Sequence, residues 1–423
     1  MSIDYSNALA TPENVIKGKK YRFTVLTPRL IRMEYSEDGT FEDHLTTLVL
    51  NRKTAAVEYT KKEDKKYLEI TTSYFRLTYE KNKPFYSGKF DTMKYLKVEL
   101  LNTDKIWYYG HPEIRNYGSP NSSLDDNKGK LKLKKGLYSV DGFASIKDEN
   151  DLILENGTVK QRENKNIDLY LFLYLKDFAL CLKDYFLITG SPALIPRYAL
   201  GNWWSKNEEY NDLSLKDLVD DFKNKEIPLS ILLLDKKWHI DEYKDKIYDS
   251  GFTWNKTLFS NPKKMIDYLH KSGIRLGLNI NPVPGILPYE PSYDVLAHTL
   301  EKQEDILVFN VMNDAVIENY FNFLIHPLDK MGVDFYWIDE TTKKERENAI
   351  LDYYHTEDMK KDYQKRPMLL SRNVTSAPHR YPVLYSGKTI VSWDTLKMIP
   401  FHNALASNIG VSYWAHDIGG YYI

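Results

Sequence analysis

Polar side chains in the second half of the sequence stand at the ends of short apolar segments, where such groups can act together. The carboxylates Asp235 and Asp339 close "LSILLLD" and "VDFYWID", so they take the same position in a repeated pattern. One aspartate at such a place is commonly only the N-cap of a following helix, but the recurrence favours a shared pocket. Carboxylates and arginine bind pairs of hydroxyl groups, and aromatic rings stack on sugars, so we expect a polyhydroxylated substrate. The other polar residues at segment ends are Lys206, Asn281, Arg372, His416 and Asp417.

The elements that must position these residues are short strands that alternate with helices from residue 193 onward. Strands that are apolar throughout are buried on both faces, as in parallel sheets. The repeated βα order therefore predicts an α/β (β/α)8 TIM-type barrel over 193–423, with its chemistry at the carboxyl ends of the strands. A closed barrel needs eight strands, and we count seven, so we predict that the barrel is incomplete at its C-terminus. The predicted strands are 199–205, 229–235, 274–281, 333–339, 367–372, 381–387 and 410–417.

The first half of the sequence, 1–192, has the alternation of β-strands. Polar and apolar residues alternate in 20–36, 66–80 and 95–101, and turn-forming residues separate these runs. We find no long amphipathic helix between them. The pattern predicts an antiparallel β-sandwich domain in front of the barrel.

Composition excludes several classes of protein. The 58 basic and 59 acidic residues leave a net charge of −1, which gives no support to a nucleic-acid partner. Cys181 is the single cysteine, so an internal disulfide is excluded and a reducing compartment is expected. The first residues lack the basic and apolar regions of a signal peptide, and no apolar run approaches the ~20 residues that span a bilayer. We therefore predict a cytoplasmic protein with no membrane partner.

Six motifs, in this order, resemble family 31 of the glycoside hydrolases, which are retaining α-glycosidases such as α-glucosidases and α-xylosidases. The resemblance covers about 193–423, and the β-rich first half fits the galactose-mutarotase-like sandwich that precedes the barrel in that family. The motifs are "PRYALGNWWS", "IPLSILLLDKKWH", "FTWNKTLFSNPKKMIDYLHKSGIRLGLNINP", "HPLDKMGVDFYWID", "LLSRNVTSAPHRYPVLYSGKT" and "SNIGVSYWAHDIGG".

The resemblance implies a role for each matching position. Asp339 stands where the family keeps its nucleophile, which forms a glycosyl-aspartate on an α-linked oligosaccharide or glycoside without metal or cofactor. His416 and Asp417 match a motif that shapes the seventh strand end, where a structural role is as well supported as a substrate contact. Core packing is the default for Trp203, Trp204 and Trp238. The positions that the resemblance assigns to the sugar pocket are Asp235, Trp337, Arg372, Tyr385, His416, Asp417 and Tyr421.

The most informative departure from the family is Lys388. It stands in "YSGK", where the family has the aspartate that acts as acid/base. An ammonium with a reference pKa of ~10.4 is a poor proton donor to a leaving alkoxide at neutral pH, and we expect it to pair with Asp339 and blunt the nucleophile. Lys237 similarly replaces the second aspartate of the family's "DxDW" motif, and the family's pocket histidine belongs to the eighth unit.

Two acidic neighbours offer no convincing replacement for the acid. Glu340 follows Asp339 directly and should point to the opposite side of an extended backbone, whereas Asp394 is expected in the first turn of a helix. Three accounts stay open: a retaining α-glycoside hydrolase impaired by Lys388, a catalytically inactive member that binds a carbohydrate or a protein, and a fragment completed by another chain. We favour simple loss of the acid over a pocket rebuilt for an anionic sugar. Sugar, linkage and oligomeric state stay undetermined.

Overall fold

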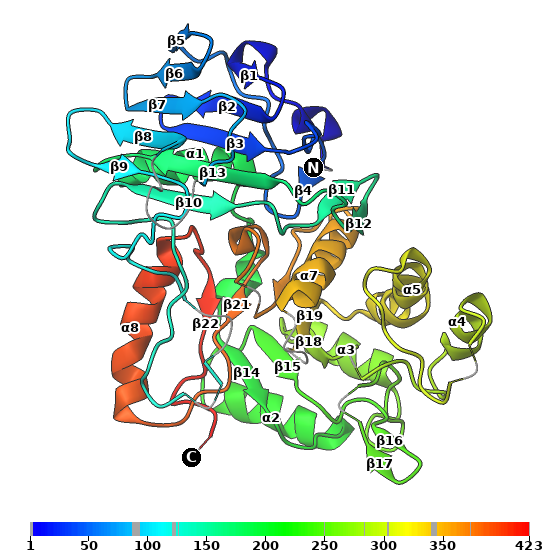
Figure 1. Ribbon diagram of the computed structural model, residues 1–423. Helices are drawn as coiled ribbons and strands as arrows, with labels where there is room; N and C mark the ends of the chain where they lie inside the picture. Colours follow the sequence, from blue (N-terminus) through cyan, green and yellow to red (C-terminus); the bar gives the residue numbers. More distant parts are fainter. Residues whose placement is uncertain are drawn as a thin grey trace.

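The computed structural model describes residues 3–86, 94–120, 124–125, 127–248, 250–282, 284–302, 304–339, 345–372 and 374–422. Two regions are stacked one above the other (Figure 1). Antiparallel sheets form the upper region, which comes from the first half of the chain. Parallel strands with surrounding helices form the lower region, which comes from the second half.

Two five-stranded antiparallel sheets form most of the upper region, and they share one apolar core. The core includes Phe23 and Met33 from the first sheet and Leu77 and Val98 from the second. The first sheet has the order β1 (Val15–Lys17), β2 (Tyr21–Thr27), β3 (Leu30–Tyr35), β13 (Ile167–Leu173) and β10 (Phe143–Lys147). The second has the order β5 (Thr60–Glu63), β6 (Tyr67–Thr71), β7 (Phe75–Glu80), β8 (Leu96–Leu100) and β9 (Ile106–Trp107). A three-stranded sheet is formed by β12 (Thr158–Lys160), β11 (Ile153–Glu155) and β4 (Leu45–Thr46).

The alternating runs 20–36 and 66–80 are hairpins rather than single strands. Strands β2 and β3 pair antiparallel around Pro28 and Arg29, and β6 and β7 pair antiparallel around residues 72–74. In 20–36 the odd-numbered positions carry buried apolar residues both before and after the turn, so the hydrophobic period alone does not show where the chain reverses. In 66–80 the buried positions change from even to odd numbers at the turn.

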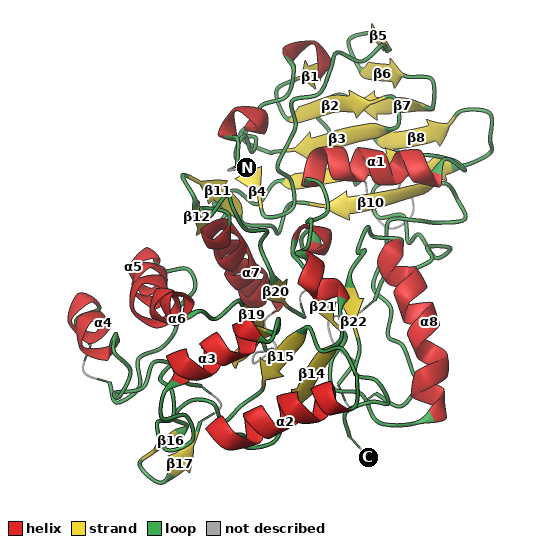
Figure 2. Cartoon of the chain, turned by 180° about the vertical axis from the view of Figure 1, so that it is seen from behind, coloured by secondary structure: helices red, strands yellow, loops and turns green. Residues whose placement is uncertain are grey.

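The first half also contains a helix that the sequence analysis did not predict, α1 (Phe178–Thr189), which follows β13 and all of the alternating runs. It lies across the outer face of the first sheet (Figure 2) and buries Cys181, Tyr185 and Ile188. The helix also carries Leu180 and Leu187 on its exposed side. Apolar residues on both sides hide the amphipathic period that marks most surface helices.

The lower region contains the parallel strands that the sequence predicts. Five strands form a parallel sheet, two further strands form a parallel pair, and a parallel bridge from Ser371 to Leu384 joins the two groups. Each strand lies within or at the edge of a predicted segment. In the described part of the chain they are β14 (Trp203–Lys206), β15 (Ile231–Leu234), β18 (Arg275–Ile280), β19 (Phe335–Ile338), β20 (Leu369–Leu370), β21 (Leu384–Tyr385) and β22 (Trp414–Ala415).

Helices cover the outside of these strands, and side-chain caps fix where several begin. The Asn211 side chain caps α2 (Asp212–Asn224) and forms a capping box with Ser214. The Ser392 side chain caps α8 (Trp393–Ser407) by accepting the Thr395 N–H. The continuous helical run that begins at Asp314 ends at Gly332, whose φ of 109° is left-handed and suits glycine. The helices are α2 (Asp212–Asn224), α3 (Pro262–Lys271), α4 (Tyr293–Thr299), α5 (Asp314–Asn319), a π-helical segment (Tyr320–Ile325), α6 (His326–Met331), α7 (Glu345–Met359) and α8 (Trp393–Ser407). The short elements are the hairpin β16 (Glu242–Tyr243) and β17 (Lys246–Ile247), with 3₁₀ turns at Tyr5–Ala8, Pro12–Asn14, Arg197–Leu200 and Pro378–Arg380.

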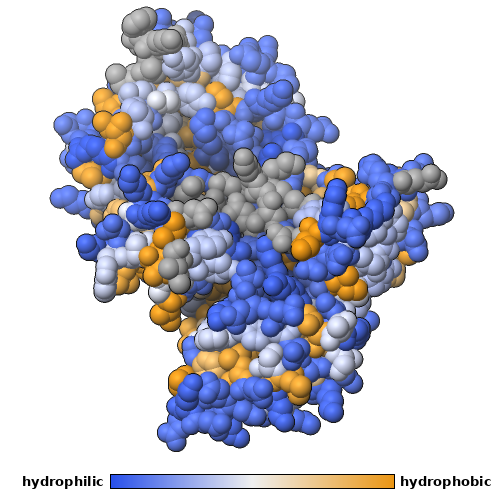
Figure 3. Space-filling view, turned by 90° about the horizontal axis from the view of Figure 1, so that it is seen from below, coloured by the Kyte–Doolittle hydropathy of each residue, from blue (hydrophilic) through white to orange (hydrophobic). Residues whose placement is uncertain are grey.

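Polar and charged side chains dominate the lower surface. Figure 3 shows this face as largely hydrophilic, with separate apolar patches between the charged groups. Among the described residues, none of the helices combines the length and the hydrophobicity that crossing a bilayer demands.

Candidate active site

The carboxylates Asp235 and Asp339 lie at the carboxyl ends of two strands of the same parallel sheet, as the sequence predicts. Asp235 directly follows β15 and Asp339 directly follows β19, with β18 between them. Asn279 on β18 bridges the two, because its Nδ2 donates to Asp235 Oδ1 at 2.7 Å and to Asp339 Oδ2 at 3.4 Å. All three residues are buried. Sequence reasoning named Asn281 at this strand end and missed Asn279, although an amide inside an apolar strand was a usable signal.

Asp339 lies between two cations. Lys388 Nζ donates to Asp339 Oδ2 at 3.2 Å, and Arg372 Nη2 lies 3.1 Å from Asp339 Oδ1. The Lys388 side chain therefore points into the site and makes the ion pair that the sequence predicts. Each oxygen of the carboxylate faces one positive charge.

Lys388 also lies against two aromatic rings. Its Nζ is 5.4 Å from the centre of the Trp337 ring and 5.3 Å from that of Tyr421, within the range of cation–π attraction. Burial works against the charged form, but the charges of Asp339 and Asp235 outweigh it and raise the pKa of Lys388. The ammonium therefore stays protonated at neutral pH and cannot act as a general base.

Arg372 connects the pocket to the first half of the chain. Its Nη1 donates to Asp125 Oδ2 at 2.5 Å, and the other oxygen of Asp125 accepts the backbone N–H of Lys388. The neighbouring Leu124 N–H donates to Ser386 O at 2.7 Å. Sequence reasoning missed Asp125, because nothing in "LDDN" indicates that this loop reaches the barrel.

Aromatic side chains line the site where the sequence places them. The rings of Trp337 and Tyr385 pack edge-to-face, with centroids 5.3 Å apart. Tyr385 OH donates to Asp417 Oδ2 at 2.5 Å, and Tyr421 OH donates to Asp235 Oδ2 at 3.1 Å. Burial raises the pKa of both phenols and of both carboxyl groups, so these hydroxyls stay protonated.

His416 has partners outside the carboxylate cluster. Its Nδ1 hydrogen-bonds Ser386 Oγ at 2.8 Å and its Nε2 hydrogen-bonds Asn403 Oδ1 on α8 at 2.7 Å. Burial lowers its pKa to about 4, so the ring is neutral. His416 thus fixes the end of β22 against α8, which supports the structural alternative for this residue.

The remaining predicted positions fall outside the cluster. Trp238 is buried and donates from Nε1 to Asn279 O at 2.8 Å, a packing role that also supports the strand end. Lys237 is exposed and has a positive φ of 74°. Asp394 lies in the first turn of α8, as expected. Glu340 lies outside the described residues.

Comparison with known proteins identifies the family of the barrel. The family model described as "Glycosyl hydrolases family 31 TIM-barrel domain" matches residues 192–422, more than half of the chain. The chain belongs to glycosyl hydrolase family 31. The resemblance and the barrel that it implies are thereby confirmed.

Curated relatives in family 31 are distant and longer. An α-xylosidase of Saccharolobus solfataricus is 25% identical over 324 residues, which cover 68% of this chain and 42% of that protein. Neutral α-glucosidase C of Mus musculus is 25% identical over 288 residues, which cover 56% of this chain and 31% of that protein. The chain thus spans less than half the length of these two relatives.

Solved family 31 structures share the fold at low identity. An α-xylosidase from Xanthomonas citri superposes with a TM-score of 0.69 at 12% identity, over 98% of this chain and 69% of that one. A dextranase from Flavobacterium johnsoniae, complexed with isomaltotriose, superposes with a TM-score of 0.66 at 16% identity, over 97% of this chain and 59% of that one. At these identities the likeness concerns the fold alone.

Proposed function

We propose that this family 31 chain is a retaining α-glycosidase that keeps its nucleophile, Asp339, but is slowed by Lys388 in the place of the acid/base. The observation that carries the proposal is the arrangement at the strand ends. Asp339 directly follows β19, lies 3.1 Å from Arg372 and shares a hydrogen bond from Asn279 with Asp235. The relatives named as α-xylosidase and α-glucosidase support an α-linked glycoside as the substrate.

The reaction has two steps. In the first, an oxygen of Asp339 forms a bond to the anomeric carbon while the bond to the leaving group breaks and its electron pair departs. In the second, water attacks the anomeric carbon, a base takes the proton from the water, and Asp339 is released with the sugar hydrolysed. Asp235 and Arg372 bind hydroxyl groups of the sugar, and Trp337 and Tyr385 enclose it.

Lys388 slows both steps. A leaving alkoxide needs a proton in the first step, and water must lose one in the second. The protonated Lys388, whose pKa is raised by its carboxylate neighbours, is a weak acid and offers no lone pair as a base. It also stabilises the ionised Asp339, whose charge disappears when the ester forms.

A second candidate is an inactive member that binds carbohydrate without turning it over. The ion pair between Lys388 and Asp339 at 3.2 Å favours this candidate, because the ammonium holds an oxygen of the carboxylate that would have to attack the sugar. An anionic sugar is disfavoured. In the described site Asp125, Asp235, Asp339 and Asp417 outnumber the two cations Lys388 and Arg372.

The proposal also divides the chain into a galactose-mutarotase-like sandwich, 1–192, and a catalytic barrel, 193–423. The protein acts in the cytoplasm. Fusing each half separately to a reporter and measuring its folding and location tests the division and the compartment.

Fluoride release from α-glucosyl, α-xylosyl and α-galactosyl fluorides tests the proposal. Fluoride departs without a proton, so the first step no longer needs the missing acid. We expect one sugar to give a burst of fluoride, whereas the matching O-glycoside is hydrolysed slowly or not at all. A folded protein that binds sugar and releases no fluoride from any of the three supports the inactive candidate instead.

A further inference from the structure

A cluster of metal-ligating side chains lies on the outer helices, away from the strand-end pocket. His326 and Asp329 are one turn apart on α6, so they share a face, and Asp358 lies near the end of α7. One ligand atom from each of the three lies within 4.8 Å of those of the other two. His326 Nε2 and Asp358 Oδ2 are already 3.0 Å apart. Figure 2 shows α6 and α7 in the same part of the molecule.

Neighbouring donors already hold one oxygen of each carboxylate. Tyr336 OH donates to Asp329 Oδ1 at 2.6 Å, and Lys361 Nζ donates to Asp358 Oδ1 at 2.7 Å. Each aspartate thus keeps its second oxygen for the cluster. Outer hydrogen bonds of this kind orient the ligands of protein metal sites.

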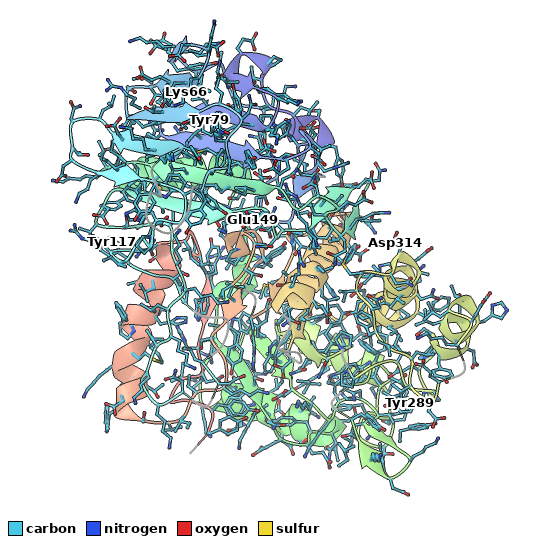
Figure 4. The ribbon with its side chains drawn as sticks, viewed as in Figure 1. Lys66, Tyr79, Tyr117, Glu149, Tyr289 and Asp314 are labelled. Carbon is cyan, nitrogen blue, oxygen red and sulfur yellow. The ribbon has the colours of Figure 1, made fainter. Side chains whose placement is uncertain are left out.

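The local backbone and surface fit a cation. The π-helical segment Tyr320–Ile325 ends directly before His326, and π-helical turns inside helices are frequent at functional sites. His326 and Asp358 line a cavity of about 690 Å³. Among the described residues that line it are four carboxylates and one lysine: Asp314, Glu318, Glu357, Asp358 and Lys361. Asp314 is labelled in Figure 4 at the start of α5.

We propose that His326, Asp329 and Asp358 bind one divalent transition-metal ion, zinc first among them, which joins α6 to α7. Imidazole nitrogen with carboxylate oxygen suits zinc, which takes three protein ligands and an open fourth position. Tetrahedral ligands ~2.0–2.2 Å from zinc lie about 3.3–3.6 Å from one another. His326 Nε2 and Asp358 Oδ2, 3.0 Å apart, are near this spacing. Rotation of the Asp329 side chain brings its ligand atom from within 4.8 Å to the same spacing.

Binding changes one proton position. The metal replaces the hydrogen bond between Nε2 and Oδ2, and the neutral imidazole carries its proton on Nδ1 instead. The open fourth position faces the cavity, because two of the three ligands line it. The site stabilises the contact between the helices, since a ligand that binds only the folded state raises Tm.

The test uses the full chain, stripped with a chelator and titrated with zinc sulfate. Calorimetry and elemental analysis after gel filtration give affinity and stoichiometry, and circular dichroism checks folding. We expect one zinc per chain and a higher Tm. We expect the His326→Gln and Asp358→Asn variants to bind at least ~100-fold more weakly, and Tyr336→Phe to bind about 10–100-fold more weakly.

His270→Gln is the matched control. His270 Nε2 pairs with Asp334 Oδ2 at 2.7 Å, so this variant breaks the same kind of imidazole–carboxylate pair outside the cluster. It should bind zinc as tightly as the wild type. If His326→Gln does not fold, Asp329→Asn at an exposed position replaces it. Three results overturn the proposal: no zinc bound at micromolar concentration, equal binding in the ligand variants, or equal loss in the control. Binding of magnesium in place of zinc also overturns it.

Discussion

The Lys388→Asp variant is expected to hydrolyse O-glycosides about 10²–10⁴ times faster than the wild type, because a positioned general acid contributes a factor of that size. The new carboxyl group lies beside Asp339 and Asp235. Neighbouring carboxylates raise the pKa of one member of such a group, so one stays protonated and can donate to the leaving oxygen. In the second step the same group, ionised, takes the proton from water.

The ion pair supplies a second, separable effect. Lys388 Nζ lies 3.2 Å from Asp339 Oδ2, and unit charges at this distance attract each other by about 5 kcal/mol at an effective dielectric constant of ~20. This is an upper bound on what the first step loses when the ester forms, since desolvation of both charges opposes it. Lys388→Met removes the attraction without supplying an acid. It should therefore speed fluoride release but leave O-glycosides almost unhydrolysed.

The assay compares initial rates on α-glycosyl fluorides and matching O-glycosides for the wild type, Lys388→Asp, Lys388→Met and Lys216→Asp. Lys216 is exposed on α2, so Lys216→Asp is the same change of charge outside the cluster and should leave both rates unaltered. The reasoning is refuted if Lys388→Asp folds and is no faster than Lys388→Met on O-glycosides.

Three further predictions concern stability and chemistry. Asp339→Asn should abolish fluoride release. It should also lower the free energy of unfolding in urea by about 3 kcal/mol, because Lys388 and Arg372 lose the carboxylate that balances their charges. An unchanged free energy of unfolding would contradict the buried ion pairs. Tyr385→Phe should cost about 1 kcal/mol in the same measurement, because the half-buried carboxylate of Asp417 loses its donor. Burial raises the pKa of Glu290 to about 7, above its ordinary value of 4.5. The stability that its protonated form contributes is therefore complete below about pH 4.5 and lost by about pH 7, a fall of about 3 kcal/mol. Unfolding at pH 5 and pH 8 should show that Glu290→Gln removes this part of the pH dependence.

The positions of the site carboxylates could be predicted because they depend on local pattern. The apolar runs before Asp235 and Asp339 are strands for a local reason, since only a doubly buried strand tolerates so few polar residues. The parallel topology then places their carboxyl ends at the same edge of the sheet, one on each side of β18. The contact between Lys388 and Asp339 followed from the motif that places both residues at strand ends.

Contacts between distant segments could not be predicted in this way. Asp125 reaches Arg372 across 247 residues of sequence, and no period or motif encodes that approach. Asn279 looked like part of an apolar strand, and its role depends on the two aspartates that flank it in space. Helix α1 was missed because it carries apolar residues on both its buried and its exposed side, which hides the helical period. Its position is determined by the sheet that it covers rather than by its own pattern.

Peptide-level mass spectrometry of the wild type after incubation with α-glucosyl, α-xylosyl and α-galactosyl fluorides tests most directly whether Asp339 is still a nucleophile. The first step proceeds without an acid and the second lacks a base, so a glycosyl ester should accumulate on the peptide that contains Asp339 and be absent from Asp339→Asn. A folded wild-type protein that carries no sugar after incubation with any of the three fluorides, or carries it on another residue, would contradict the account.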